Sequence, residues 1–188
     1  MWIVDVSSGL LDTATYRASP NCNARPAGVA IDLIVIHGIS LPEGEFGGPW
    51  IDALFANQIK GTEHPNFASL KGLKVSSHLL IRRDGEILQY VPFTKRAWHA
   101  GVSEFKGRAN CNDFSIGIEL EGADNIAYGA IQYEQLNKTL RALLHAYPAV
   151  QNPECIVGHV HIAPGRKTDP WPVFNWSLVR AALATSKN

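Results

Sequence analysis

Histidine and carboxylate side chains at two distant points of this 188-residue chain have the types and spacing of metal ligands. His37 ends an apolar run typical of a buried strand, and the ends of such strands are where α/β folds place reactive groups. His159 follows Gly158, and Asp169 comes ten residues later. Two histidines and one carboxylate from separate segments are a donor set of catalytic zinc sites. Because no short metal-binding signature is present, the spacing alone leaves structural or surface roles for these residues open.

A candidate general base lies on a third segment, the alternating run Phe114–Leu120. Its apolar residues point to one face, so that Gly117, Glu119 and Glu121 point to the other. Gly117 leaves room beside Glu119 for a ligand or another chain segment. A carboxylate that lines a cleft can act as a general base, whereas two carboxylates on one strand face are more often solvated. Glu121 is the weaker candidate, because it is nearer the end of the strand.

Two loops carry side chains that suit a sugar with an acidic substituent. Trp98 and His99 lie among basic residues in Phe93–Val102, and an aromatic wall beside a cation fits a sugar face and a carboxylate. The alternative is a packed tryptophan with a solvated basic rim. Arg108 belongs to a polar loop that leads into the Glu119 strand, and its planar guanidinium could clamp an anionic group.

The elements that must position these residues alternate between strands and helices. The run Ile31–His37 has the β-branched, apolar pattern of a strand buried on both faces. A Gly/Pro loop follows it, and Pro49 suits the first position of a helix. Asp84-Gly85 between two β-rich runs predicts a hairpin. Further strands are predicted at Val75–Ile81, Glu86–Val91 and Phe114–Leu120. A leucine stripe from Leu136 to Tyr147 predicts a long helix that ends before Pro148, and Asn175 can cap a final helix.

One hairpin among βα units predicts a mixed sheet with helices packed on it, an α/β fold in a single domain over residues 1–188. Lys+Arg and Asp+Glu are both 17, which argues against a nucleic-acid partner. No apolar run is long enough to span a membrane, and the first residues lack the pattern of a secretory signal. Three widely spaced cysteines without a CxxC pair suggest reduced thiols in the cytoplasm. We therefore expect a cytoplasmic protein without membrane, nucleic-acid or obligate protein partners.

Five ordered blocks of the chain resemble the zinc amidases that cleave N-acetylmuramoyl-L-alanine, a family shared with phage lysozyme-type amidases and peptidoglycan recognition proteins. The blocks are IVIHGISLPEGEFGGPWIDALF, VSSHLLIRRDGEILQYVPF, KRAWHAGVS, CNDFSIGIELEG and GHVHIAPGRKTDP. The match runs from about Ser19 to the last predicted helix. It implies a mixed sheet with surrounding helices and a zinc ion at one end of the sheet.

The resemblance also assigns roles, residue by residue. It implies His37, His159 and Asp169 as the zinc ligands, Glu119 as the catalytic glutamate that moves the proton, and Lys167 as the cation that stabilises the oxyanion. The substrate groove would contain Trp98, His99, Arg108, Arg166 and Lys74.

The implied reaction is hydrolysis of the amide between N-acetylmuramic acid, in its 1,6-anhydro form, and the L-alanine of a muropeptide. A cytoplasmic enzyme of this kind would act in peptidoglycan recycling and would indirectly lower β-lactamase induction. Two other interpretations use the same fold: a module that binds muropeptides without cutting them, and an envelope amidase acting on the polymeric wall. The complete ligand set disfavours the first, and the cysteine pattern and missing signal disfavour the second.

The chain departs from the usual pattern of the family at several positions. Gly38 stands where the family usually has asparagine after the first ligand, and Trp171 stands where it usually has glycine after Asp169-Pro170. Lys74 and Asn110 occupy positions that are often arginine. These departures bear on substrate affinity and leave the ligands and Glu119 in place.

Overall fold

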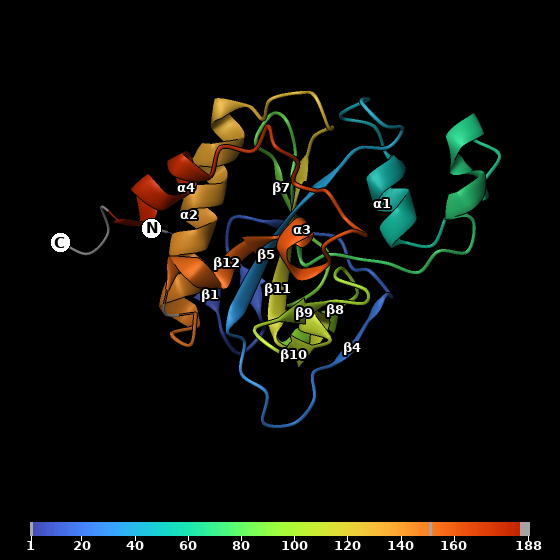
Figure 1. The fold of residues 1–188 in the computed structure, drawn as a ribbon. Helices are drawn as coiled ribbons and strands as arrows, with labels where there is room; N and C mark the ends of the chain where they lie inside the picture. Colours follow the sequence, from blue (N-terminus) through green and yellow to red (C-terminus); the bar gives the residue numbers. More distant parts are fainter. Residues whose placement is uncertain (1, 151, 185–188) are drawn as a thin grey trace.

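A six-stranded sheet forms the centre of the computed structural model, which describes residues 2–150 and 152–184 (Figure 1). Its strands are β3 (Thr15–Tyr16), β5 (Leu33–Ile39), β6 (Leu79–Ile81), β7 (Ile87–Gln89), β11 (Ser115–Glu121) and β12 (Ile156–Gly158). They lie in the order β12-β5-β11-β6-β7-β3. The β6–β7 hairpin is antiparallel and the other neighbours are parallel, so the predicted mixed sheet is confirmed.

Within residues 2–150 and 152–184, three pairs of short antiparallel strands lie outside this sheet: β1 (Val4–Asp5) with β2 (Leu10–Leu11), β4 (Cys22–Ala24) with β8 (Lys95–Ala97), and β9 (Glu104–Phe105) with β10 (Arg108–Ala109). The sequence did not predict them, because two or three residues are too few to display an alternating pattern.

Four α-helices accompany the sheet in the described part of the chain: α1 (Trp50–Phe55), α2 (Ala130–Ala146), α3 (His159–Ile162) and α4 (Trp176–Ala184). The long helix α2 ends before Pro148, as predicted. The Asn175 side chain caps α4 by accepting a hydrogen bond from the backbone N–H of Ser177 at 3.1 Å. Short 3₁₀ helices occupy Pro65–Leu70, Cys111–Asp113 and Pro153–Cys155. No helix among the described residues has the length and apolarity that crossing a bilayer requires.

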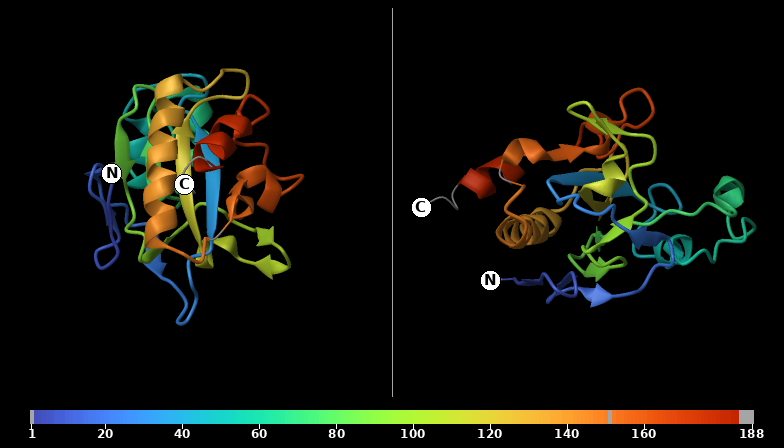
Figure 2. Two further views of the ribbon diagram at one scale, coloured as in Figure 1. Left: turned by 90° about the vertical axis from the view of Figure 1, so that its left-hand side faces the viewer. Right: turned by 90° about the horizontal axis from the view of Figure 1, so that it is seen from below.

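Helices α2 and α1 cover opposite faces of the sheet (Figure 2). On β11, Ile116, Ile118 and Leu120 belong to the core that includes α2, as their alternation predicts. The intervening residues of β11 face the other side, toward the loops that follow β5 and β8. His37 on β5 and Glu119 on β11 therefore lie on the face of the sheet away from α2.

Two boundaries differ from the prediction and bear on the site. Strand β5 begins at Leu33 and continues through His37 to Ile39, rather than ending at His37. The segment after Gly158, expected as a loop, opens with the one-turn helix α3. In the parallel pairing of β5 with β11, His37 is the direct partner of Glu119.

Candidate metal and catalytic site

The three predicted metal ligands converge on one point, although they come from β5, α3 and the segment after it. Nδ1 of His37 lies 3.0 Å from Nδ1 of His159 and 3.3 Å from Oδ2 of Asp169. Nδ1 of His159 lies 3.2 Å from the same carboxylate oxygen. Ligands that hold zinc at about 2.0–2.2 Å in a tetrahedron are themselves separated by roughly 3.3 Å, so this triangle has the size of a zinc site.

The hydrogen bond that His159 makes outside the ligand cluster shows that the cluster suits a cation. Nε2 of His159 lies 3.2 Å from the carbonyl oxygen of Ala100, which can only accept, so this nitrogen carries the ring proton. Nδ1 of His159 therefore presents a lone pair to the Asp169 carboxylate. Two acceptors at that distance repel each other unless a cation lies between them. Burial also lowers the pKa of His37 to about 4, which keeps this ring neutral, as a metal ligand must be.

Glu119 extends from β11 beside the metal-ligand cluster and is buried. Burial raises the pKa of its carboxyl well above the ordinary value; the nearby Asp169 acts in the same direction and Lys167 opposes it. A carboxylate with a raised pKa beside a metal site is suited to general-base work.

Glu121 is also buried, so neither carboxylate belongs to a solvated strand face. Its oxygens accept hydrogen bonds from the backbone N–H groups of Gly47 and Arg83, and the Arg82 guanidinium pairs with it at 3.3 Å. The Glu121 carboxylate thus holds these loop segments in place, which leaves Glu119 as the carboxylate available for chemistry.

A cavity of about 250 Å³ joins these residues, and Lys167 lies at its lining. Within residues 2–150 and 152–184, the Lys167 ammonium takes part in no ion pair or hydrogen bond, which argues against the surface ion pair as its role. The remaining wall is largely apolar and comes from three segments: Ile39 and Leu41, Leu54 and Phe55 of α1, and Leu70, Leu73 and Val75. The sequence did not indicate these residues as part of the site, because an apolar residue that lines a pocket has the same pattern as one in a core.

The predicted substrate residues divide into two groups. Trp98 and His99 line the cavity. Lys74 lies at a small adjoining hollow that shares Leu54, Leu70 and Leu73 with it.

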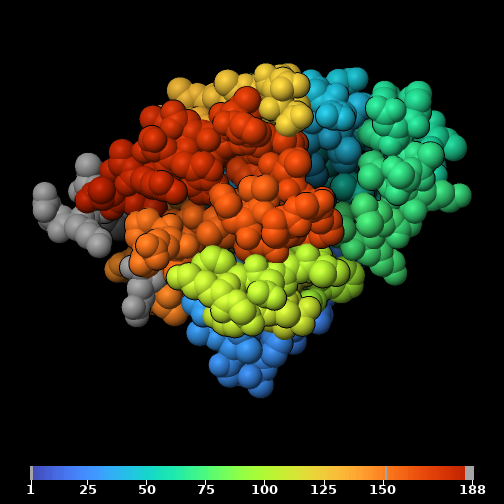
Figure 3. All heavy atoms as spheres, viewed as in Figure 1, coloured from blue at the N-terminus to red at the C-terminus, as the bar shows by residue number. Residues whose placement is uncertain are grey.

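The structure does not bring Arg166 or Arg108 to the cavity lining. Arg166 donates to the carbonyl oxygens of Ala100 and Val102, and the segments that carry these residues lie against each other in Figure 3. Arg108 pairs with Asp32, next to the opposite end of β5 from His37, and stacks on the ring of Phe114 at 3.8 Å. Their guanidinium groups are thus engaged in holding loops.

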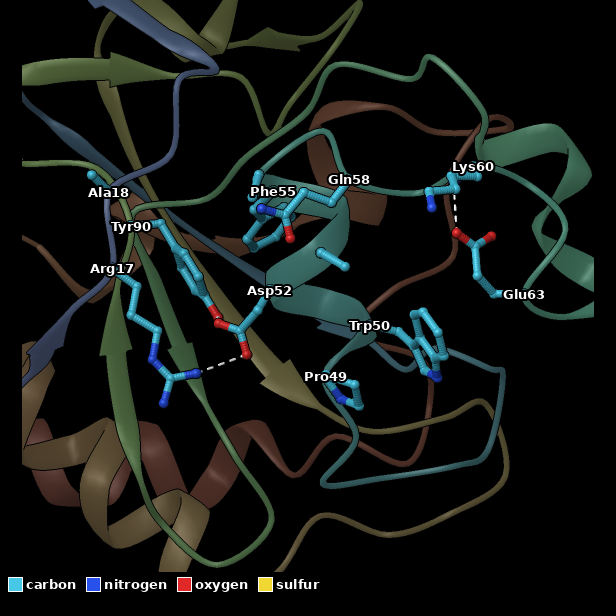
Figure 4. A pocket seen from close by; sticks show the side chains of 12 residues that line it. Arg17, Ala18, Pro49, Trp50, Asp52, Phe55, Gln58, Lys60, Glu63 and Tyr90 are labelled. Atoms are coloured by element: carbon cyan, nitrogen blue, oxygen red, sulfur yellow. Dashed lines mark hydrogen bonds and ion pairs between the residues drawn. The ribbon is translucent and has the colours of Figure 1, made fainter.

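A larger cavity, of about 670 Å³, lies elsewhere around α1 (Figure 4). It contains none of the metal-ligand cluster. Arg17 and Arg82 both pair with the Asp52 carboxylate, which also accepts a hydrogen bond from the Tyr90 hydroxyl at 2.7 Å. Arg17 and Asp52 satisfy each other's charge, and the lining residues include no cluster of metal ligands beside a candidate general base, so we do not assign the reaction to this cavity.

Gly38 and Trp171, two of the departures in sequence, are in contact. A Cβ added to Gly38 would lie closer than 3.0 Å to ring atoms of Trp171 and to the hydroxyl oxygen of Tyr128. Trp171 itself has φ +64°, a left-handed conformation that favours glycine. The indole therefore occupies the direction in which a side chain at position 38 would extend.

Comparison with known proteins places this site in a family. The N-acetylmuramoyl-L-alanine amidase family matches residues 27–172. The 1,6-anhydro-N-acetylmuramyl-L-alanine amidase AmpD of Salmonella typhimurium (strain SL1344) is 56% identical over 180 residues, which cover 96% of this chain and 95% of the relative.

Solved structures agree. A crystal structure of a selenomethionine derivative of AmpD has a TM-score of 0.90 at 56% identity, covering 93% of this chain and 97% of that one. The amidase AmiD from E. coli, in complex with the substrate anhydro-N-acetylmuramic acid-L-Ala-D-gamma-Glu-L-Lys, has a TM-score of 0.60 at 27% identity, covering 85% of this chain and 61% of that one. The chain is therefore an enzyme of the N-acetylmuramoyl-L-alanine amidase family.

Proposed function

We propose that this enzyme is a zinc-dependent amidase that cleaves the bond between 1,6-anhydro-N-acetylmuramic acid and L-alanine in muropeptides. The observation that carries the proposal is the convergence of His37, His159 and Asp169 beside the buried Glu119. The substrate is supported by the AmpD relatives, whose name specifies the anhydro sugar, and by the complex of AmiD with an anhydro-muropeptide.

His37, His159 and Asp169 would hold the zinc ion, with Nδ1 of each histidine and Oδ2 of the aspartate as ligand atoms. Zinc at such a site supplies a Lewis acid for the scissile carbonyl and lowers the pKa of water. Glu119 takes the proton from the attacking water and delivers it to the amine of the leaving L-alanine. The free ammonium of Lys167 stabilises the negative charge that develops on the carbonyl oxygen.

The cavity offers separate surfaces to the two ends of the substrate. Trp98 borders it with an indole whose Nε1 is held by Asn23 at 2.8 Å, so that the ring face can receive the apolar side of a sugar. Leu70, Leu73 and Val75 provide the apolar wall. In the cell, we place the reaction in the cytoplasm, in the recycling of peptidoglycan fragments, where removal of anhydro-muropeptides would lower β-lactamase induction.

The test is hydrolysis of a purified anhydro-muropeptide followed by mass spectrometry of both products. We expect release of anhydro-N-acetylmuramic acid and of a peptide with a free L-alanine amine. A chelator should abolish turnover, and added zinc should restore it. Binding of the anhydro-muropeptide without cleavage by the zinc-loaded protein would instead indicate a recognition module. Faster cleavage of polymeric wall than of the soluble fragment would indicate an envelope amidase.

A further inference from the structure

His99, which the sequence suggested as a substrate residue, contacts a metal ligand. Its Nδ1 lies 2.9 Å from Nε2 of His37, on the side of that ring away from Asp169. The His99 ring fits there because residue 117 is glycine: an added Cβ would lie 2.5 Å from Cγ of His99. The space that Gly117 leaves beside Glu119 is thus filled by this ring.

The hydrogen bonds beyond His99 determine which atom donates and which accepts at each step of the series from His37 through His99 and Ser115 to Cys111. The Cys111 carbonyl oxygen can only accept, so the Ser115 hydroxyl donates to it, at 2.5 Å. The Ser115 oxygen then accepts from Nε2–H of His99 at 3.1 Å. In a neutral imidazole the other nitrogen is unprotonated, so Nδ1 of His99 accepts from Nε2–H of His37. This leaves the lone pair of His37 on Nδ1, the atom in the ligand cluster.

The second histidine ligand is fixed from the neighbouring residue. Nε2–H of His159 donates to the carbonyl oxygen of Ala100, at 3.2 Å. The backbone at His99 and Ala100 is itself held, since both N–H groups donate to Oδ1 of Asn112, at 3.1 and 2.8 Å. One two-residue segment therefore orients both histidine ligands.

We propose that His99 is a positioning residue for the metal site: it fixes the tautomer and the ring orientation of His37 through the chain His37–His99–Ser115–Cys111. Together with the Ala100 carbonyl, it presents two preformed nitrogen donors to the ion. This inference rests on the proposed zinc site. Partners of this kind typically account for a 10- to 100-fold change in metal affinity when removed.

The experiment compares zinc affinity, by competition with a chromophoric chelator, in four variants of the full chain. His99→Leu removes the acceptor for His37 and should raise the zinc Kd about 10- to 100-fold. His99→Asn restores an oxygen acceptor near the position of Nδ1 and should recover part of that loss. Ser115→Ala should raise the Kd less than His99→Leu does. The control is Ser77→Ala, because Ser77 is equally buried and its hydroxyl has no hydrogen-bond partner among the described residues; its Kd should match the parent.

A second readout does not depend on any variant folding. In the zinc-free parent, ¹⁵N NMR of the imidazole rings should show His37 protonated on Nε2 and unprotonated on Nδ1. A zinc Kd for His99→Leu equal to that of the parent, or His37 protonated on Nδ1 in the parent, would overturn the inference. If the parent itself bound no zinc, the proposed function would fail, which separates the two outcomes.

Discussion

The contact between Gly38 and Trp171 predicts that their substitutions are not additive. Gly38→Ala adds one methyl group, which would lie within 3.0 Å of two Trp171 ring atoms and of the Tyr128 hydroxyl oxygen. Overpacking of this kind costs about 1–3 kcal/mol of unfolding free energy. The upper half of that range is expected, because both neighbours are large rings and Tyr128 is buried.

Removing the indole changes the expected cost. Trp171→Gly loses the packing of a half-buried ring. It also removes the strain of the left-handed conformation at φ +64°, because that conformation costs a residue with a Cβ about 1–2 kcal/mol and glycine adopts it freely. In the Trp171→Gly background, two of the three nearest atoms are gone, and the Tyr128 hydroxyl oxygen still crowds the new methyl group. Gly38→Ala should then cost about 1 kcal/mol, giving a coupling energy of about 1–2 kcal/mol between the two positions.

The assay is a double-mutant cycle by urea unfolding, followed by circular dichroism so that the signal does not depend on the tryptophan. Gly48→Ala is the control: its nearest neighbour would lie at an ordinary 3.5 Å, and its unfolding free energy should stay within about 0.5 kcal/mol of the parent. Additive costs for the two substitutions, within about 0.5 kcal/mol, would show that the indole does not occupy the side-chain direction of Gly38.

Three further predictions concern the catalytic carboxylate, the loop arginine and pH. Glu119→Gln should retain zinc and lose about 10²–10⁴-fold in kcat, whereas Glu121→Gln should mainly lower stability; the reverse order in steady-state kinetics would mean that the strand register is misassigned. Arg108→Ala should leave KM unchanged, because its guanidinium is engaged away from the cavity, and a several-fold rise in KM would contradict that position. Between pH 7.5 and 5.5 the unfolding free energy should fall with falling pH, because burial holds the pKa of His78 well below its ordinary value and the unfolded chain binds the proton first. Urea unfolding of Glu119→Gln, which lacks the buried carboxylate that acts in the opposite sense, should show a loss of about 1.4 kcal/mol in unfolding free energy from His78 over this whole pH range, and a flat profile would refute it.

The sequence predicted the central sheet and the side chains that reach one face of it. Alternation along β11 placed Glu119 opposite the apolar core, and the apolar run of β5 placed His37 near a strand end. Alternation could not separate Glu119 from Glu121, since both share a face. Only the contacts of Glu121 with Arg82 and with two loop N–H groups distinguish them.

Proximity in sequence did not predict where the arginine side chains lie. Arg108 precedes the Glu119 strand by a few residues, yet the β9–β10 hairpin directs it to Asp32. The sequence could not predict the contact between Gly38 and Trp171 either, because the two positions are far apart in the chain. Long-range contacts of this kind depend on how loops pack, and local pattern carries no information on that.

We propose that His37, His159 and Asp169 hold a zinc ion on which hydrolysis depends. The most direct measurement is zinc content and turnover of anhydro-muropeptide on the same samples of the parent and of Asp169→Ala. We expect about one zinc per chain in the parent, and loss of both metal and turnover in the variant, because two remaining ligands make a poor site. Full zinc occupancy together with unchanged turnover in Asp169→Ala would contradict the account.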